Sequence, residues 1–432
     1  MRTILLVMVG WALWATSARA QYPPDLEAEL YRLPDVIFQR VATPMGFKAA
    51  YELRIRQPLD HSDPEAGYFE QWVWLSHRGF AVPTVMVAEG YACAENAISE
   101  PTDLIGANQV VVEHRFFGRS CPADTLPWQY LDTEQAAADL HRVRELLGRL
   151  YHRRPWLCTG ISKGGQAALY YRYFYPDDVA VTLPYAAPLM RSTDDRRIPD
   201  YLEQAGGAAC VAAVEAFQVR ILEERQAVLR ALGWYALGSG LTFEQIGGLE
   251  VALEYAVLEY PMQLWQWHAD CALVPEPGDL DADIRHLLAI VDLSLWSDEG
   301  IDRYRPHYYQ AATEVGYYHY RTDKIATLLT HLSGSPSAAL PSILPESTCY
   351  RPRLTRKVTR WLRKHGHRIV YLYGEHDPWS AVGVPPSSRV DALWYQIPDA
   401  HHGTARIKSL PEIDQQKLLA QVMYWVDRAE EP

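Results

Sequence analysis

Apolar and polar residues alternate in two neighbouring segments of the chain. Residues 51–61 read YELRIRQPLDH, residues 68–78 read YFEQWVWLSHR, and a turn-rich SDPEAG separates them. Alternation of this kind is typical of strands with one buried face. Two such strands joined by a turn predict an antiparallel hairpin.

Short, continuous apolar runs follow the hairpin and are bounded by turn residues. Runs of this length predict fully buried parallel strands. They cover Thr84–Tyr91, Gln109–Gly118, residues 155–160 and Val179–Pro188. Between the second and the third, residues 132–151 have helical periodicity, with Asp132 or Thr133 as the expected N-cap. Strands that alternate with helices indicate a doubly wound α/β sheet.

The alternation stops near Met190. Residues 190–344 are mostly helical in pattern, and strands return at Arg368–Trp379 and Ala392–Gly403 before a last helix over about Pro411–Ala429. We therefore expect an α/β-hydrolase fold: a mostly parallel, doubly wound sheet with an inserted helical cap domain. The expected parts are a signal peptide (1–20), the first part of the core (21–189), the cap (190–344) and the second part of the core (345–432).

The first twenty residues have the pattern of a signal peptide. Arg2 supplies the positive start, Ile4–Trp14 the apolar stretch, and residues 18–20 (ARA) a small-x-small cleavage site. A membrane anchor is the alternative, but this run is shorter than the ~20 apolar residues that a span needs. We expect a secreted or periplasmic protein, cleaved near Ala20.

Charge narrows the range of partners. The net charge is −12, and no run of Lys or Arg stands out against it. Nucleic acid and an anionic membrane are therefore disfavoured as partners. The 14 Trp and 27 Tyr residues, in contrast, suggest aromatic-lined surfaces.

Six cysteines are scattered along the chain without a CxxC pair, so a zinc site is disfavoured. In an exported protein they could form up to three disulfide bonds. Cys93 and Cys121 follow two of the apolar runs and are the first pair we would expect, whereas Cys158 lies within an apolar run and fits a buried thiol.

Ser162 lies between Gly160 and Gly164, where an apolar run meets a helical pattern. A nucleophile elbow has this form, because the tight strand-to-helix turn strains the serine backbone and needs small neighbours. The alternative is a serine that merely caps a helix.

The order of the remaining chemistry favours the elbow. A triad on this architecture runs Ser, then Asp or Glu, then His. Asp377 and the adjacent His401 and His402 each follow a predicted strand, in that order. Glu375 is a rival acid. Adjacent histidines without a third ligand nearby make a poor metal site, so we expect no metal and no cofactor.

Other polar residues sit at strand ends or among aromatics. The amides of Lys163 and of Tyr91 or Gly90, in AEGYAC, are the expected oxyanion donors. Arg115 follows Glu113 and fits a structural ion pair. Glu314 lies among five tyrosines in YYQAATEVGYYHYR, a setting that suits a substrate ammonium group or an aromatic core.

Several of these motifs together resemble a known family. GISKGGQ, EHRFFGRS, YGEHDPW and the late histidine motif resemble the secreted prolyl tripeptidyl/tetrapeptidyl aminopeptidases, a family of serine peptidases. PLDH, GYFEQ, AEGY and YQAATEVG are similar to the related lysosomal Pro-X carboxypeptidase and dipeptidyl peptidase II. The likeness runs from about residue 45 to the end.

The resemblance implies roles for individual residues. Ser162 would be the nucleophile, Asp377 the orienting acid, and His402 or His401 the base, with His402 slightly preferred. It also implies release of short N-terminal peptides, tripeptides first, with proline before the cut. Trp379 would line the proline pocket, and an acid such as Glu314 or Glu113 would bind the free N-terminus of the substrate.

Other functions stay open. A Pro-X carboxypeptidase would need a cation for the substrate carboxylate, with Arg115 or Arg119 available. A carboxylesterase or lipase would use the same triad. A non-catalytic scaffold would be expected to have lost a triad member.

Overall fold

A computed structural model of the chain describes residues 25–122, 126–152, 154–332, 334, 336–338, 340–345 and 348–429. The expected signal peptide lies outside these residues. In the part of the chain that is described, no helix is both long and apolar enough to cross a membrane.

One nine-stranded sheet organises the molecule, in the order β1-β2-β3-β5-β4-β6-β7-β8-β9. The pairs from β1 to β5 are antiparallel and those from β5 to β9 are parallel. The predicted hairpin is confirmed as β2 and β3, and the buried apolar runs become β4 to β7. The bounds are β1 Val36–Arg40, β2 Ala49–Asp60, β3 Asp63–His77, β4 Thr84–Ala88, β5 Asn108–Val112, β6 Trp156–Ile161, β7 Val181–Tyr185, β8 Val370–Gly374 and β9 Leu393–Ile397.

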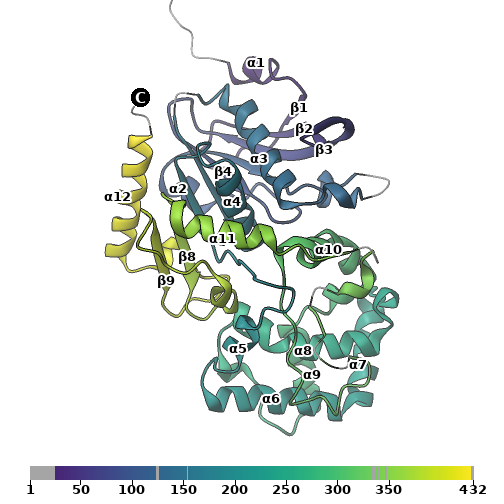
Figure 1. Cartoon of the computed structure of the whole chain (residues 1–432). Coiled ribbons are helices and arrows are strands. Elements are labelled where there is room, and N and C mark those ends of the chain that lie inside the picture. The colour runs from purple at the N-terminus through teal and green to yellow at the C-terminus, as the bar shows by residue number, and fades with distance from the viewer. Residues whose placement is uncertain are drawn as a thin grey trace, which may run out of the picture.

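Helices cover both faces of this sheet (Figure 1). Neighbouring strand residues point to opposite faces, so Met86 and Cys158 pack with α3 (Thr133–Gly148) and α4 (Lys163–Phe174). Val85 and Leu157 pack instead with α12 (Glu412–Arg428). Asp132 caps α3 as expected, since its side chain accepts a hydrogen bond from the Gln135 amide at 2.7 Å. Three further helices are α1 Leu26–Leu30, α2 Glu100–Leu104 and α11 Arg353–His365.

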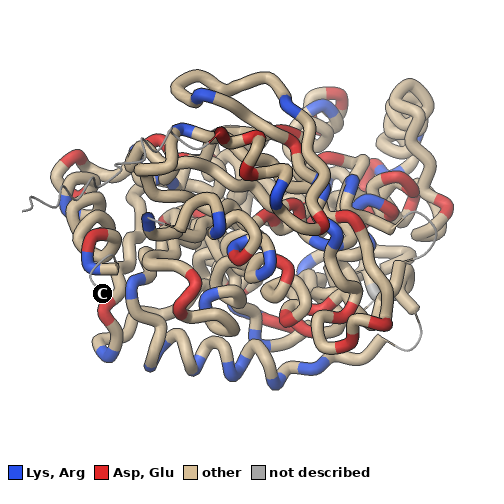
Figure 2. Tube along the Cα trace, turned by 90° about the horizontal axis from the view of Figure 1, so that it is seen from above, with Lys and Arg blue, Asp and Glu red and all other residues tan. Residues whose placement is uncertain are grey.

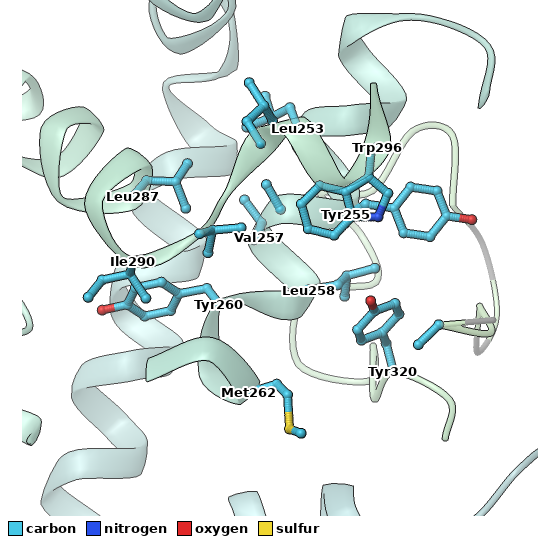
Figure 3. Close-up of a cluster of buried hydrophobic side chains, with 14 of the residues drawn as sticks. Leu253, Tyr255, Val257, Leu258, Tyr260, Met262, Leu287, Ile290, Trp296 and Tyr320 are labelled. Atoms are coloured by element: carbon cyan, nitrogen blue, oxygen red, sulfur yellow. The ribbon is translucent and has the colours of Figure 1, made fainter. Parts of the chain in front are cut away.

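Between β7 and β8 the chain forms a helical layer, which Figure 1 shows below the sheet. Its centre is α8 (Leu249–Trp267), which is buried on most sides because its neighbours surround it. Figure 3 shows Leu253, Tyr255 and Leu258 of α8 among aromatic and aliphatic side chains of this layer. The other helices are α5 Arg197–Leu202, α6 Ala208–Glu223, α7 Arg225–Ser239, α9 Leu280–Ile290 and α10 Asp298–Gln310. Together with the sheet, they make an α/β-hydrolase fold with a helical insertion.

The expected Cys93–Cys121 pair is wrong. Both thiols are free, and the Glu113 carboxylate joins their two loops by accepting hydrogen bonds from the Cys93 and Ser120 amides at 2.8 and 2.7 Å. The disulfide of this structure joins Cys210 and Cys271 within the helical layer. Position after an apolar run could not reveal which Cβ atoms face each other, and that geometry decides pairing.

Removing this disulfide should loosen the helical layer. Cys210→Ser with Cys271→Ser opens a loop of 61 residues, and closing such loops contributes about 2–4 kcal/mol of stability. We expect a lower unfolding temperature for the double variant, measured by calorimetry. Cys93→Ser serves as the control, and an unchanged transition in the double variant would contradict the prediction.

Candidate active site

Ser162 occupies a strained turn between β6 and α4. Its φ of 57° and ψ of −123° are angles that side-chain-bearing residues rarely adopt. A Cβ on Gly160 would lie 2.3 Å from the Gly164 backbone, and one on Gly164 would lie 2.4 Å from the Ala88 oxygen. The serine side chain makes no capping hydrogen bond to α4. These features match the nucleophile elbow rather than a helix cap.

Asp377 and His402 form a buried pair. Asp377 follows β8, and its Oδ2 lies 2.7 Å from His402 Nδ1 while its Oδ1 accepts a hydrogen bond from the Trp379 amide at 3.0 Å. The exposed fraction is 0% for Asp377 and 4% for His402. His401 turns to its own loop, where its Nδ1 accepts a hydrogen bond from the Gly403 amide. The rival Glu375 accepts a hydrogen bond from the Asp399 amide instead.

A cavity of about 490 Å³ brings Ser162 and His402 to one space. Nine of its twenty lining residues are Trp or Tyr, and Trp379 is among them. The others are Tyr91, Trp267, Trp296, Tyr304, Tyr308, Tyr317, Tyr318 and Tyr320. Its lining comes from the sheet loops and from the helical layer, so the two parts of the chain build the site jointly.

The Gly90–Tyr91 loop lies against the elbow. A Cβ on Gly90 would approach the Gly164 nitrogen and the Lys163 Cβ to 2.6 Å, so only glycine fits. The buried Lys163 amino group donates a hydrogen bond to the Gly90 oxygen at 2.6 Å, and burial holds its pKa well below the usual value. Lys163 begins α4, where backbone N–H groups have no partner within the helix. The geometry therefore suits the expected oxyanion donors, Tyr91 and Lys163.

Glu113 and Glu314 do not line this cavity. Glu113 accepts hydrogen bonds from Ser120 and Cys93, as described above, and so joins two loops. Glu314 lies in the turn that follows α10, and its Oε2 accepts a hydrogen bond from the Thr133 amide at the start of α3, at 2.8 Å. Both acids have structural partners instead of a place beside the serine, because the chain turns them toward neighbouring backbone amides.

The Glu314 carboxyl should make stability depend on pH. Burial, and then the charge of Asp132, raises its pKa to about 7. The folded state therefore binds more protons than the unfolded state between the ordinary value of 4.5 and about 7, so the free energy of unfolding should fall as pH rises through this window. Buried histidines such as His307, whose pKa is lowered to about 3, contribute the opposite slope, so the measured quantity is the difference between two proteins. In urea titrations, the stability of wild type relative to Glu314→Gln should fall as pH rises from about 4.5 to about 7. Burial also raises the pKa of Glu89 to about 7, and this contribution is common to both proteins. Equal slopes in the two proteins would contradict the assignment.

Two acids line the cavity, the exposed Asp292 and Glu259 on α8, and the sequence analysis named neither. The buried one is Glu259. Its carboxylate accepts hydrogen bonds from Tyr318, Tyr320 and Gln263 at 2.9, 2.7 and 2.7 Å. Burial raises its pKa, and these three donors oppose the shift. The tyrosine-rich segment was thus a valid signal for an acid in an aromatic setting, but the acid comes from another helix.

Two cavity side chains have polar atoms that no described residue satisfies. They are Nδ1 of His307 and Nε1 of Trp379. Burial, and then the charge of Lys163, lowers the pKa of His307 to about 3, so this imidazole is neutral. A bound peptide or a water molecule would supply the missing partners.

Arg115 is a structural residue, as the sequence suggests. Its guanidinium is fully buried and makes a bidentate pair with Asp139, with both distances 2.7 Å. Arg119 pairs with Glu52 and lies outside the cavity wall. Neither cation is therefore placed to receive a substrate carboxylate.

Comparison with known proteins agrees with this geometry. The profile of the PS-10 peptidase S37 family matches residues 25–431. The chain belongs to this family. The prolyl tri/tetrapeptidyl aminopeptidase of Streptomyces mobaraensis is 32% identical over 413 residues, which cover 93% of this chain and 85% of that protein. This S37 chain is therefore a serine peptidase.

More distant relatives share parts of the chain. The thymus-specific serine protease of Mus musculus is 31% identical over 156 residues, 32% of this chain and 31% of that protein. Among solved structures, a proline iminopeptidase from Mycobacterium smegmatis aligns with 87% of this chain and 99% of its own, at 14% identity and a TM-score of 0.39.

Proposed function

We propose that this S37 peptidase releases short peptides, tripeptides first, from the free N-termini of exported or extracellular polypeptides, with proline preferred before the cut. The observation that carries the proposal is the placement of Glu259 in the same aromatic cavity as Ser162 and His402. The relative from Streptomyces mobaraensis, named for the release of prolyl tri- and tetrapeptides, supports it.

The catalytic mechanism follows from the Asp377–His402 pair and from the nucleophile elbow at Ser162. Ser162 Oγ attacks the scissile carbonyl carbon while His402 Nε2 takes the serine proton. Asp377 holds the imidazole through Nδ1 and stabilises the imidazolium that forms. The amides of Tyr91 and Lys163 receive the developing oxyanion. His402 then returns the proton to the leaving amine, and water cleaves the acyl-enzyme.

Glu259 would bind the substrate ammonium group. A carboxylate among tyrosine rings attracts a cation through charge and through the ring faces. The incoming ammonium would also favour the ionised form of Glu259, whose pKa burial otherwise raises. An acylated N-terminus lacks this charge and would leave the buried carboxylate without its partner.

The length of α8 supports a tripeptide. The Gln266 carbonyl accepts a hydrogen bond from the His402 amide at 3.1 Å, which places this end of α8 at the catalytic loop. Glu259 is seven residues earlier on the same helix, or ~10 Å at about 1.5 Å per residue. Three extended residues also span ~10 Å. Helix α8 would therefore set the distance between the substrate ammonium group and the scissile bond.

The aromatic wall suits proline. Trp379 packs with Tyr317 and Tyr318, with ring centroids 6.0 and 5.9 Å apart. A flat apolar ring next to the scissile bond would fit such a surface, and the free indole N–H of Trp379 could donate to a substrate carbonyl.

A Pro-X carboxypeptidase is the second candidate, because Arg406 lines the cavity. Its guanidinium already donates hydrogen bonds to the His402 and Ala405 carbonyls at 3.2 and 3.0 Å. Arg406 therefore supports the loop of His402, and a substrate carboxylate would have to compete with both carbonyls.

Matched substrates test the proposal with the mature protein and with Ser162→Ala as a blank. We expect hydrolysis of free Ala-Ala-Pro-anilide, with kcat/KM on the order of 10²-fold above the N-acetylated compound. Ala-Pro- and Pro-anilides report the length of the released peptide. Release of the C-terminal residue from an N-blocked Pro-X peptide would favour the carboxypeptidase, and turnover of a short acyl ester alone would contradict a peptidase of either kind.

A further inference from the structure

The helix α11 carries a strongly basic segment in an acidic protein. Residues 351–368 contain eight Arg or Lys and no Asp or Glu, although the whole chain has a net charge of −12. Figure 2 shows α11 along the lower edge of the view, with basic positions on successive turns. The expectation that no run of Lys or Arg stands out is therefore wrong for this segment, because the acidic residues elsewhere in the chain outweigh it in the net charge.

The basic side chains line a groove of about 800 Å³ between α11 and the segment 386–389. There are six of these side chains: four on α11, together with Arg191 and Arg389. The lining contains no acidic residue. The Ser387 hydroxyl donates a hydrogen bond to the Arg363 carbonyl at 2.7 Å and so holds the segment on the helix. The four helix residues are Arg356, Arg360, Arg363 and Lys364.

These cations have no acidic partner among the residues that the structure describes. Within the described ranges, none of the six makes an ion pair, whereas surface arginines such as Arg54 and Arg303 pair with glutamates. Arg356, Arg360 and Lys364 also follow one another at i, i+4 spacing, which places like charges side by side and weakens a helix. The opposite face of α11 is held by buried Val358 and Leu362. The fold thus keeps a row of like charges, which repel one another, on the face of α11 opposite Val358 and Leu362.

The lining chemistry favours phosphate groups. A guanidinium offers paired N–H donors that match phosphate oxygens, and several of them here converge on one groove. The positions from Arg356 to Lys364 span eight residues, ~12 Å along the helix, which is room for more than one phosphate. No aromatic side chain lines the groove, so a stacking platform for nucleic acid bases is missing from this lining.

We propose that this basic groove binds arrays of phosphate groups that carry no nucleobases, and so retains the peptidase at phosphate-bearing polymers or surfaces. The inference does not depend on the substrate specificity proposed above, because the groove shares no lining residue with the cavity of Ser162.

Binding assays on the whole protein test this directly. The probes are long-chain inorganic polyphosphate, phosphatidylcholine vesicles with and without one-third phosphatidylglycerol, polyglutamate and duplex DNA, each at low and at physiological ionic strength. The groove variant combines Arg356→Glu, Arg360→Glu and Arg363→Glu. The control variant has the same net charge and combines Arg149→Glu, Arg230→Glu and Arg285→Glu, three exposed arginines outside the groove.

We expect wild type and the control variant to bind polyphosphate in a salt-sensitive manner, and the groove variant to bind it at least tenfold more weakly. Anilide hydrolysis should be unchanged in both variants. Binding to the anionic vesicles as well would identify lipid headgroups as a source of the phosphate, and binding to polyphosphate alone a soluble polymer. The proposal would be overturned if neither polyphosphate nor the anionic vesicles bound, or if both variants lost polyphosphate binding equally. A preference for polyglutamate or DNA over polyphosphate would overturn it as well.

Discussion

Replacing His402 by alanine should lower kcat by about 10⁴-fold or more, whereas His401→Ala should change it by less than about tenfold. The two histidines are adjacent, but only His402 has its Nδ1 on the buried Asp377 carboxylate. Without the imidazole, Ser162 has no base to take its proton, and Asp377 is left buried without its partner. Hydrolysis of a free tripeptidyl anilide measures the effect.

The triad also predicts non-additive losses. Ser162→Ala with His402→Ala should cost about as much as either change alone, because the members act as a unit. Thermal unfolding of each variant checks that the fold is retained. A large loss in His401→Ala with a small one in His402→Ala would reverse the assignment of the base.

Glu259→Gln should lower kcat/KM for a free tripeptidyl substrate by on the order of 10²-fold. Glutamine keeps the size of the side chain and can still accept hydrogen bonds from Tyr318 and Tyr320, but it removes the charge that would bind the ammonium group. The N-acetylated substrate should be hydrolysed equally slowly by both proteins, since it has no ammonium to lose.

Comparing the free and the N-acetylated substrate distinguishes a role of Glu259 in binding the ammonium group from a purely structural role. Glu314→Gln is the matched control, because Glu314 is half-buried within the same tyrosine-rich segment and lies outside the cavity wall. We expect it to leave the preference for a free N-terminus intact. Equal losses on both substrates in Glu259→Gln would show that Glu259 only supports the tyrosines, and the amine-binding role would then be wrong.

Local patterns in the sequence were sufficient to predict the main strands, the helical insertion and the strained turn of this protein. Apolar runs bounded by turns predicted the strands, the loss of that alternation after Met190 predicted the helical insertion, and Gly160 and Gly164 marked the strained turn at Ser162. These features are readable because each depends on residues that are close in the chain: side-chain period, turn chemistry and backbone strain.

Tertiary structure alone decided which distant groups meet. The buried acid of the cavity, Glu259, lies 59 residues from Tyr318, and only the packing of α8 brings them together. The same holds for the choice of His402 over its neighbour, for the Cys210–Cys271 disulfide, and for the groove that gathers Arg191 and Arg389 beside α11. Hydrogen bonds, disulfides and charge clusters depend on direction and distance in space, which sequence spacing between separate elements does not specify.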